Sequence, residues 1–133
     1  MLVMAEHRAT NKDLVVWQKA FALALCIYRS SERFPRSKLF GLASQIRRAA
    51  VSIPSNIAEG AARRTTREFI MFLHIARGSL AEVETQILLA RQLGYLDEQQ
   101  RGELETLVAE VGRLVNSFIV GLRRRRDAAP TNR

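Results

Sequence analysis

The sequence predicts an all-α protein, folded as an antiparallel, up-down-up-down four-helix bundle. Apolar residues recur at intervals of three and four along four long segments of the 133-residue chain, which is the period of one face of an α-helix. Glycine (7) and proline (3) are scarce, so few residues interrupt these segments. The connections between segments are short, and short connections make neighbouring helices antiparallel. The length corresponds to one domain.

The first predicted helix runs from about Asp13 to Phe34. Asn11 or Asp13 can cap its start, and Pro35 ends it because the residue before a proline avoids the α region. The inner face is predicted to be Leu14, Trp17, Phe21, Ala24 and Tyr28. Beside it lies a second apolar set, Val16, Ala20, Leu23 and Ile27.

The second predicted helix, about Ser37 to Ala62, contains the most informative stretch, residues 52–60 (SIPSNIAEG). A proline within a helix removes a backbone donor and costs about 3 kcal/mol or more. The apolar spacing nevertheless runs through Pro54, so we expect the helix to continue and to bend there. Gly60 is expected on the core side, where it allows close backbone approach. The inner stripe is Leu39, Leu42, Ile46, Ala49, Ile53 and Ile57.

Polar residues lie on the side of this helix away from the inner stripe: Ser52, Ser55, Asn56 and Glu59. The default interpretation is a solvated face or a subunit contact, because an amphipathic helix needs a polar face. The alternative is a site for RNA or for protein on the stripe formed by Arg48, Ser52, Ser55 and Glu59, which Arg63 continues. Glu59 can pair with Arg63 at i+4.

The third predicted helix starts with a capping box formed by Thr65 and Glu68 and ends at Gly94, which suits a left-handed cap. Its inner stripe is Phe69, Phe72, Ala76, Leu80, Val83, Ile87 and Ala90. The fourth starts near Asp97, with Gln100 three residues on, and ends in an arginine run. Its inner stripe is Leu104, Leu107, Val111, Leu114 and Phe118. The predicted domain organisation is an N-terminal extension (1–12), the bundle (13–122) and a basic, disordered tail (123–133).

The charge distribution predicts a partner with many negative charges. The formal net charge is +8 and the pI about 11.0. Residues 29–64 carry eight basic side chains against two acidic ones, and residues 123–133 carry five against one. Such basic zones are typical of nucleic-acid binders. The candidate phosphate-binding residues are Arg47, Arg48, Arg63, Arg64, Arg67, Arg123, Arg124, Arg125 and Arg126.

Several classes of protein are disfavoured by the sequence. The single cysteine, Cys26, excludes an intramolecular disulfide and favours the cytoplasm. The longest apolar run, from Ala20 to Tyr28, is shorter than the roughly 20 residues of a membrane span, and the chain start lacks the pattern of a signal peptide. No spacing of residues predicts a metal site, a cofactor site or a catalytic triad, so we expect no enzyme activity.

Several segments carry a resemblance to a known family: residues 41–60 (GLASQIRRAAVSIPSNIAEG), 68–80 (EFIMFLHIARGSL), 84–86, 93–95 and 14–20. They resemble the signature of the bacterial four-helix-bundle family named for proteins encoded in 23S rRNA intervening sequences. The resemblance covers roughly Asp13 to Leu122 and implies a fold more than a function. Within its motif, the residues that it implies to be structural are Ser52, Pro54, Asn56, Glu59 and Gly60.

Relatives in this family include the accessory protein of diversity-generating retroelements, a basic homopentamer that binds nucleic acid and a reverse transcriptase. The resemblance implies a non-catalytic, homo-oligomeric, preferably pentameric adaptor that binds RNA or DNA and has a protein partner such as a reverse transcriptase. The alternative is a protein-interaction scaffold without nucleic-acid binding. A small-molecule enzyme is disfavoured, because titratable groups do not converge.

Excess apolar surface predicts self-association. Helix one offers two adjoining apolar sets, and helix two adds a flank away from its main stripe. An exposed patch of that size is larger than monomers usually tolerate, and a repeated heterologous contact closes into a ring. The predicted interface residues are Val16, Leu23, Ile27, Phe40, Val51 and Ala58.

Overall fold

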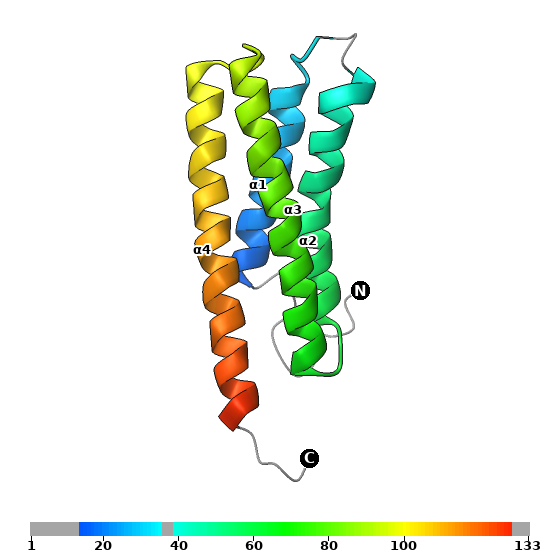
Figure 1. Ribbon diagram of the computed structural model, residues 1–133, viewed down its shortest axis with the longest axis vertical. Coiled ribbons are helices and arrows are strands. Elements are labelled where there is room, and N and C mark those ends of the chain that lie inside the picture. The colour runs from blue at the N-terminus through cyan, green and yellow to red at the C-terminus, as the bar shows by residue number, and fades with distance from the viewer. Residues whose placement is uncertain (1–13, 36–38, 129–133) are drawn as a thin grey trace.

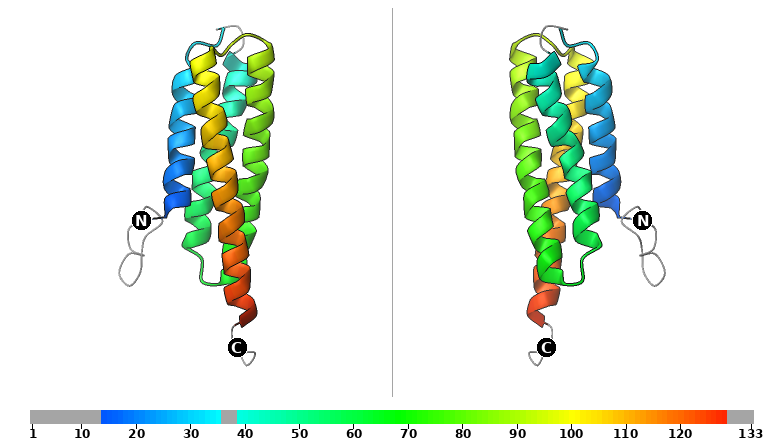
Figure 2. Two further views of the ribbon diagram at one scale, coloured as in Figure 1. Left: turned by 90° about the vertical axis from the view of Figure 1, so that its left-hand side faces the viewer. Right: turned by 90° about the vertical axis from the view of Figure 1, so that its right-hand side faces the viewer.

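Four helices make up most of the computed structural model, which describes residues 14–35 and 39–128. They are α1 (Val15–Ser31), α2 (Ser44–Ala61), α3 (Thr66–Gln92) and α4 (Glu98–Ala128). No strand occurs in the two described ranges, so the all-α prediction is confirmed. Consecutive helices run in opposite directions (Figure 1). Both α1 and α3 pack against α2 and α4, which closes the bundle (Figure 2). The predicted extension, residues 1–12, lies outside the described residues.

The core is a column of aliphatic side chains contributed by all four helices. Removing apolar surface from water stabilises by about 25 cal/mol per Å², so this column is the main source of stability. None of the described helices is both long and apolar enough to cross a membrane. The largest fully buried side chains are Leu23, Ile27, Ile46, Ile53, Ile57, Leu73, Val83, Ile87, Leu104, Val111, Val115 and Ile119.

α1 faces the core mainly with the second of its two apolar sets, so the predicted inner face was wrong at Phe21 and Tyr28, whereas Ala24 is buried as predicted. Val16, Leu23 and Ile27 are only 3%, 0% and 1% exposed. Phe21 and Tyr28, predicted to be inside, are 47% and 42% exposed. Both sets have helical spacing, and periodicity alone does not say which of them meets the core. Val16, Leu23 and Ile27 are also removed from the predicted oligomer interface, because their side chains are buried within the chain itself.

The ends of α1 differ from the prediction. The helix begins after Leu14, which makes no side-chain capping hydrogen bond, and the predicted caps Asn11 and Asp13 lie outside the described residues. It ends at Ser31, before the predicted end at Phe34. A short turn then carries the chain to Phe34, whose side chain is buried in the core.

α2 begins later than predicted, because Gly41 interrupts the helical backbone. In the wide turn Leu39–Ala43, Gly41 has φ −99° and ψ −108°. From Ser44 the helix continues through Pro54 to Ala61, as predicted. The predicted inner stripe is confirmed at four positions, all buried: Ile46, Ala49, Ile53 and Ile57.

α3 has the predicted caps. Thr65 Oγ1 accepts a hydrogen bond from the Glu68 backbone N–H at 3.1 Å. The chain turns after the helix at Gly94, whose φ of 78° lies in the left-handed region that glycine favours. At the start of the inner stripe, Ile70 and Leu73 are buried in place of the predicted Phe69 and Phe72, which is a shift of one position. Ala76, Leu80, Val83, Ile87 and Ala90 follow as predicted.

α4 starts where predicted and continues for two residues past the arginine run. Asp97 and Gln100 cap its start reciprocally: the Asp97 N–H donates to Gln100 Oε1 at 3.0 Å, and the Gln100 N–H donates to Asp97 Oδ1 at 2.7 Å. The helix then runs to Ala128. Arg123–Arg126 therefore lie in its last turns, where the fourth helix was predicted to end, and residues 129–133 of the predicted tail lie outside the described residues. Arginine is a good helix former, so the run extends α4 past the other helices (Figure 1).

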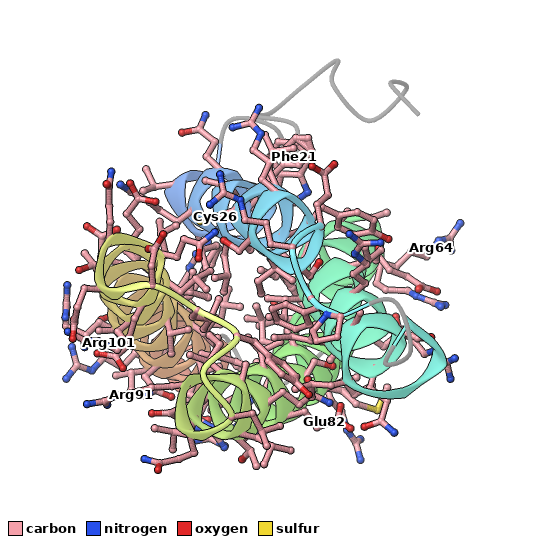
Figure 3. The ribbon with its side chains drawn as sticks, turned by 90° about the horizontal axis from the view of Figure 1, so that it is seen from above. Phe21, Cys26, Arg64, Glu82, Arg91 and Arg101 are labelled. Carbon is pink, nitrogen blue, oxygen red and sulfur yellow. The ribbon has the colours of Figure 1, made fainter. Side chains whose placement is uncertain are left out.

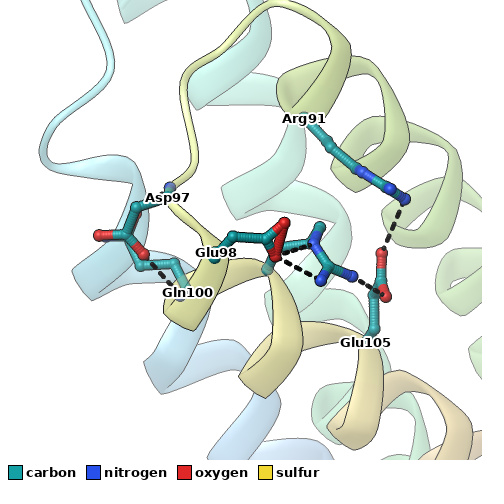
Figure 4. A network of polar contacts seen from close by, with 6 residues as sticks. Arg91, Asp97, Glu98, Gln100 and Glu105 are labelled. Carbon is teal, nitrogen blue, oxygen red and sulfur yellow. Dashed lines mark hydrogen bonds and ion pairs between the residues drawn. The ribbon is translucent and has the colours of Figure 1, made fainter.

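A network of ion pairs lies at the end where α4 begins, and one of its pairs joins α3 to α4 (Figure 4). Arg101 bonds to Glu98 and, through Nη1, to Glu105 Oε1 at 2.8 Å, while Arg91 Nη1 lies 3.5 Å from Glu105 Oε2. The hydrogen bond from Arg101 lowers the pKa of the Glu98 carboxyl. At this end of the bundle the arginines of the network are therefore partnered by carboxylates.

Candidate nucleic-acid interface

Seven of the nine candidate arginines meet at the opposite end of the bundle. Arg63 and Arg64 lie in the connection after α2, Arg67 is in the first turn of α3, and Arg123–Arg126 form the end of α4. The antiparallel topology brings these three segments together (Figure 2). All seven side chains are exposed. We call these residues, Arg63, Arg64, Arg67 and Arg123–Arg126, the arginine end.

A shallow pocket of about 260 Å³ lies within the arginine end. Arg63, Arg64 and Arg125 line it together with the apolar side chains of Phe69 and Phe118. The two phenyl rings meet edge to face with their centroids 5.2 Å apart. Arg64 projects away from the bundle (Figure 3). Guanidinium groups around an apolar floor suit a phosphate-bearing ligand, because their forked donors match phosphate oxygens.

Carboxylates neutralise only part of the arginine end. Arg63 Nη2 pairs with Glu59 Oε2 at 3.0 Å, and Arg126 Nε lies 3.3 Å from Asp127 Oδ1. Within residues 14–35 and 39–128, no ion pair to a carboxylate is formed by Arg64, Arg67 or Arg123–Arg125. The positive potential at this end is therefore available to a partner from outside.

The other two candidates, Arg47 and Arg48, lie on the opposite half of the bundle. Arg47 Nε donates to Ser31 Oγ at 2.7 Å and its Nη2 donates to the Tyr28 carbonyl at 3.1 Å. Its guanidinium also lies 4.8 Å from the centre of the Tyr28 ring. Arg47 thus satisfies acceptors at the end of α1 and joins α1 to α2. Arg48 is exposed but apart from the arginine end.

The motif of residues 52–60 mainly joins α2 to α3. Ser52 Oγ lies 2.8 Å from Ser79 Oγ, and Asn56 Nδ2 donates to the Ser52 carbonyl and hydroxyl at 2.8 and 2.9 Å. Pro54 is buried. Gly60 is buried so closely that a Cβ atom there would lie 2.7 Å from Phe72 Cβ. On the predicted polar side, Ser55 and Glu59 are exposed, whereas Ser52 and Asn56 are half-buried.

Two further residues near the arginine end, His74 and Arg77 of α3, were not singled out as binding residues by sequence reasoning. The guanidinium groups of Arg77 and of Arg123, on α4, both approach the ring of His74. The sequence separates Arg123 from His74 by 49 residues, so only the packing of α3 on α4 reveals this group.

Apolar side chains are exposed on the outer face of α1. Phe21 and Tyr28 are joined there by Leu25, which is 42% exposed. The Trp17 and Phe21 rings stack with centroids 5.2 Å apart, and Phe21 points away from the bundle centre (Figure 3). We call this the aromatic patch: Trp17, Phe21, Leu25, Tyr28 and, on α2, Val51.

The predicted interface residues of α2 fall differently. Val51 is 41% exposed and lies one turn from Arg47, whose guanidinium covers Tyr28, so the aromatic patch continues onto α2. Ala58 is half-buried. The side chain of Phe40 lies outside the described residues.

Comparisons with known proteins agree with this fold. A family model described as 23S rRNA-intervening sequence protein matches residues 12–117. A solved structure, described as a protein of unknown function from the S23 ribosomal protein family of Bacteroides thetaiotaomicron, is 28% identical. The similarity covers 81% of this chain and 97% of that one, with a TM-score of 0.73. No curated protein matches. Because the family model spans most of the sequence, the chain belongs to the 23S rRNA-intervening sequence protein family.

Proposed function

We propose that this protein is a non-catalytic, homo-oligomeric adaptor that binds RNA or DNA through the arginine end. The observation that carries the proposal is the gathering of seven exposed arginines from three segments, five of them without a carboxylate partner among the described residues. Contacts from guanidinium groups to phosphates carry no information on base identity. We therefore expect affinity that depends steeply on salt and weakly on nucleotide sequence.

The double variant Arg64→Gln, Arg125→Gln is expected to weaken RNA binding and its salt dependence. Both residues line the pocket of the arginine end. Each lost phosphate contact lowers the slope of log affinity against log salt by about 0.7 for a single strand, so the variant should lower it by about 1.4. Fluorescence anisotropy with a labelled single-stranded RNA between 50 and 300 mM KCl measures the slope.

The matched control is Arg29→Gln, Arg33→Gln, which removes the same charge from exposed positions at the far end of α1. The control should keep the wild-type slope. Equal losses in both double variants would contradict a localised site and would leave only a general effect of net charge.

Self-association is the second part of the proposal, and the aromatic patch supports it. Phe21, Leu25, Tyr28 and Val51 are each more than 40% exposed, and Phe21 stacks on the half-buried Trp17. Exposed apolar side chains gathered in one patch mark interaction surfaces. The resemblance to the retroelement accessory protein favours five subunits. A ring would present several copies of the arginine end to one nucleic acid and so strengthen binding by multivalency.

The variant Phe21→Lys is expected to dissociate the oligomer, because it places a charge in the centre of the aromatic patch. Light scattering at micromolar concentration should give about five times the 15.1 kDa chain mass for the wild type and a mass near one chain for the variant. Ala22→Lys, at the neighbouring exposed position, adds the same charge and should retain the assembly. A wild-type mass of one chain would refute the ring.

The RNA-binding and light-scattering measurements together distinguish an adaptor from a protein-interaction scaffold. An adaptor binds RNA and loses affinity with salt, whereas a scaffold shows assembly without appreciable RNA binding. The proposed protein partner, such as a reverse transcriptase, would be held beside the nucleic acid in the first case. Pull-down of a co-expressed reverse transcriptase, with and without nuclease treatment, tests that partner directly.

A further inference from the structure

The ring of His74 lies between two guanidinium groups at the contact of α3 with α4. Arg77 Nη2 is 2.8 Å from His74 Nδ1, and Arg123 Nη2 is 3.0 Å from His74 Nε2. Arg77 also donates from Nη1 to Asn116 Oδ1 at 3.0 Å. Both ring nitrogens therefore face a group that can only donate hydrogen bonds.

This cluster contains more hydrogen-bond donors than acceptors. A neutral imidazole has one N–H and one lone pair, so it can accept from only one of the two guanidinium groups. The other guanidinium then faces the imidazole N–H. An oxyanion placed among these groups would only accept, and it would satisfy the surplus donors with charge-assisted hydrogen bonds.

The charges around His74 are positive on both helices that form the cluster. Its own helix contributes Arg77 and α4 contributes Arg123. In the connection after α2, Arg63 pairs with Glu59 and covers the Phe72 ring, on the far side of α3 from His74. No ion pair to a carboxylate is formed by Arg77 or Arg123 within the described residues. Burial and then the charges of Arg77 and Arg123 lower the pKa of His74.

We propose that His74, Arg77 and Arg123 form a phosphate-binding site at which His74 takes up a proton when the phosphate binds. Asn116 holds Arg77 in place. The inference extends the proposed function, because Arg123 belongs to the arginine end, and it adds a dependence on pH. A bound phosphate places negative charge beside His74 and offsets the positive charges of Arg77 and Arg123. This favours the imidazolium form of His74.

The sign of the pH dependence follows from linkage. The pKa of His74 is depressed in the free protein and rises when the phosphate is bound. Affinity is therefore flat at high pH and increases as pH falls through the pKa of the complex. A rise of one pH unit in the pKa of His74 on binding corresponds to about a tenfold gain in affinity. We expect a gain of that order when the pH is lowered from 8 to 5.5.

NMR titration of the His74 ring tests the site directly. The probes are inorganic phosphate, a uridine oligonucleotide with hydroxyl ends, and the same oligonucleotide with a 5′-phosphate. Adding at least one of the probes should raise the pKa of His74 in the wild type. In the Arg77→Gln variant, adding the same probe should leave the pKa of His74 unchanged. A response to the hydroxyl-ended probe assigns internal phosphodiesters, whereas a response only to the other two assigns a terminal or free phosphate. An unchanged His74 pKa with all three would overturn the proposal.

Binding of the probe that responds, measured at pH 5.5 and pH 8, gives a second readout. His74→Gln should lose the gain in affinity that the wild type shows between pH 8 and pH 5.5. His7→Gln, which removes the other histidine of the sequence, should keep it. Arg113 is an exposed residue of α4 that lines a separate pocket beside α1. Arg113→Gln therefore controls for the loss of one positive charge in Arg77→Gln. A gain in affinity at low pH that persists in His74→Gln would refute the role of His74. If phosphate raised the pKa of His74 but the protein bound no RNA, only the proposed function would be refuted.

Discussion

Replacing Ile53 with aspartate is expected to lower the free energy of unfolding by more than about 4 kcal/mol, the range in which single substitutions become exceptional. Ile53 is 0% exposed in the middle of α2. The variant removes apolar contacts and places an unpaired carboxylate in the core, where a charge without a partner is strongly unfavourable. Domains are stable by only about 5–15 kcal/mol, so circular dichroism should show a much lower melting temperature or loss of the helical signal at 25 °C.

Ser55→Asp is the matched control, because it introduces the same carboxylate two residues further along α2 at an exposed position. Surface substitutions usually change stability by within about 0.5 kcal/mol, so this variant should melt close to the wild type. If Ile53→Asp melted like Ser55→Asp, the inner face of α2 would be incorrectly assigned.

Gly60→Ala is expected to destabilise the protein even though alanine is the better helix former. The added Cβ would lie 2.7 Å from Phe72 Cβ and 2.9 Å from Phe69 Cδ1. The first of these atoms is attached directly to the α3 backbone, so the two helices must move apart to accept the methyl group. Overpacking of this kind typically costs 1–3 kcal/mol, which outweighs the gain of about 1 kcal/mol from helix propensity. Thermal melting should show a decrease of several degrees.

Gly78→Ala provides the opposite case on α3, since a Cβ at Gly78 would meet no atom within 4 Å. Only the propensity gain then applies, and the melting temperature should increase. The two alanine variants therefore differ in sign. A stabilising Gly60→Ala would mean that α2 and α3 are further apart at this level than the structure has them.

Local chemistry explains why several features were predictable. The caps at Thr65 and Gly94 and the continuation of α2 through Pro54 depend on residues within about one helical turn. The core position of Gly60 follows from the spacing of the same helix.

Short-range periodicity and turn chemistry were enough to predict the all-α class, the four helices, the caps of α3 and the buried residues Ile46, Ala49, Ile53 and Ile57 of α2. They could not show which apolar set of α1 lies inside, since Val16 and Phe21 both belong to helical stripes and the rotation of α1 depends on its packing against α2 and α4. The packing of the helices also brings Arg47 into hydrogen bonds with the end of α1 and brings Arg123 next to His74. Those contacts depend on which helices are neighbours and how each is rotated, which non-local packing of the core decides.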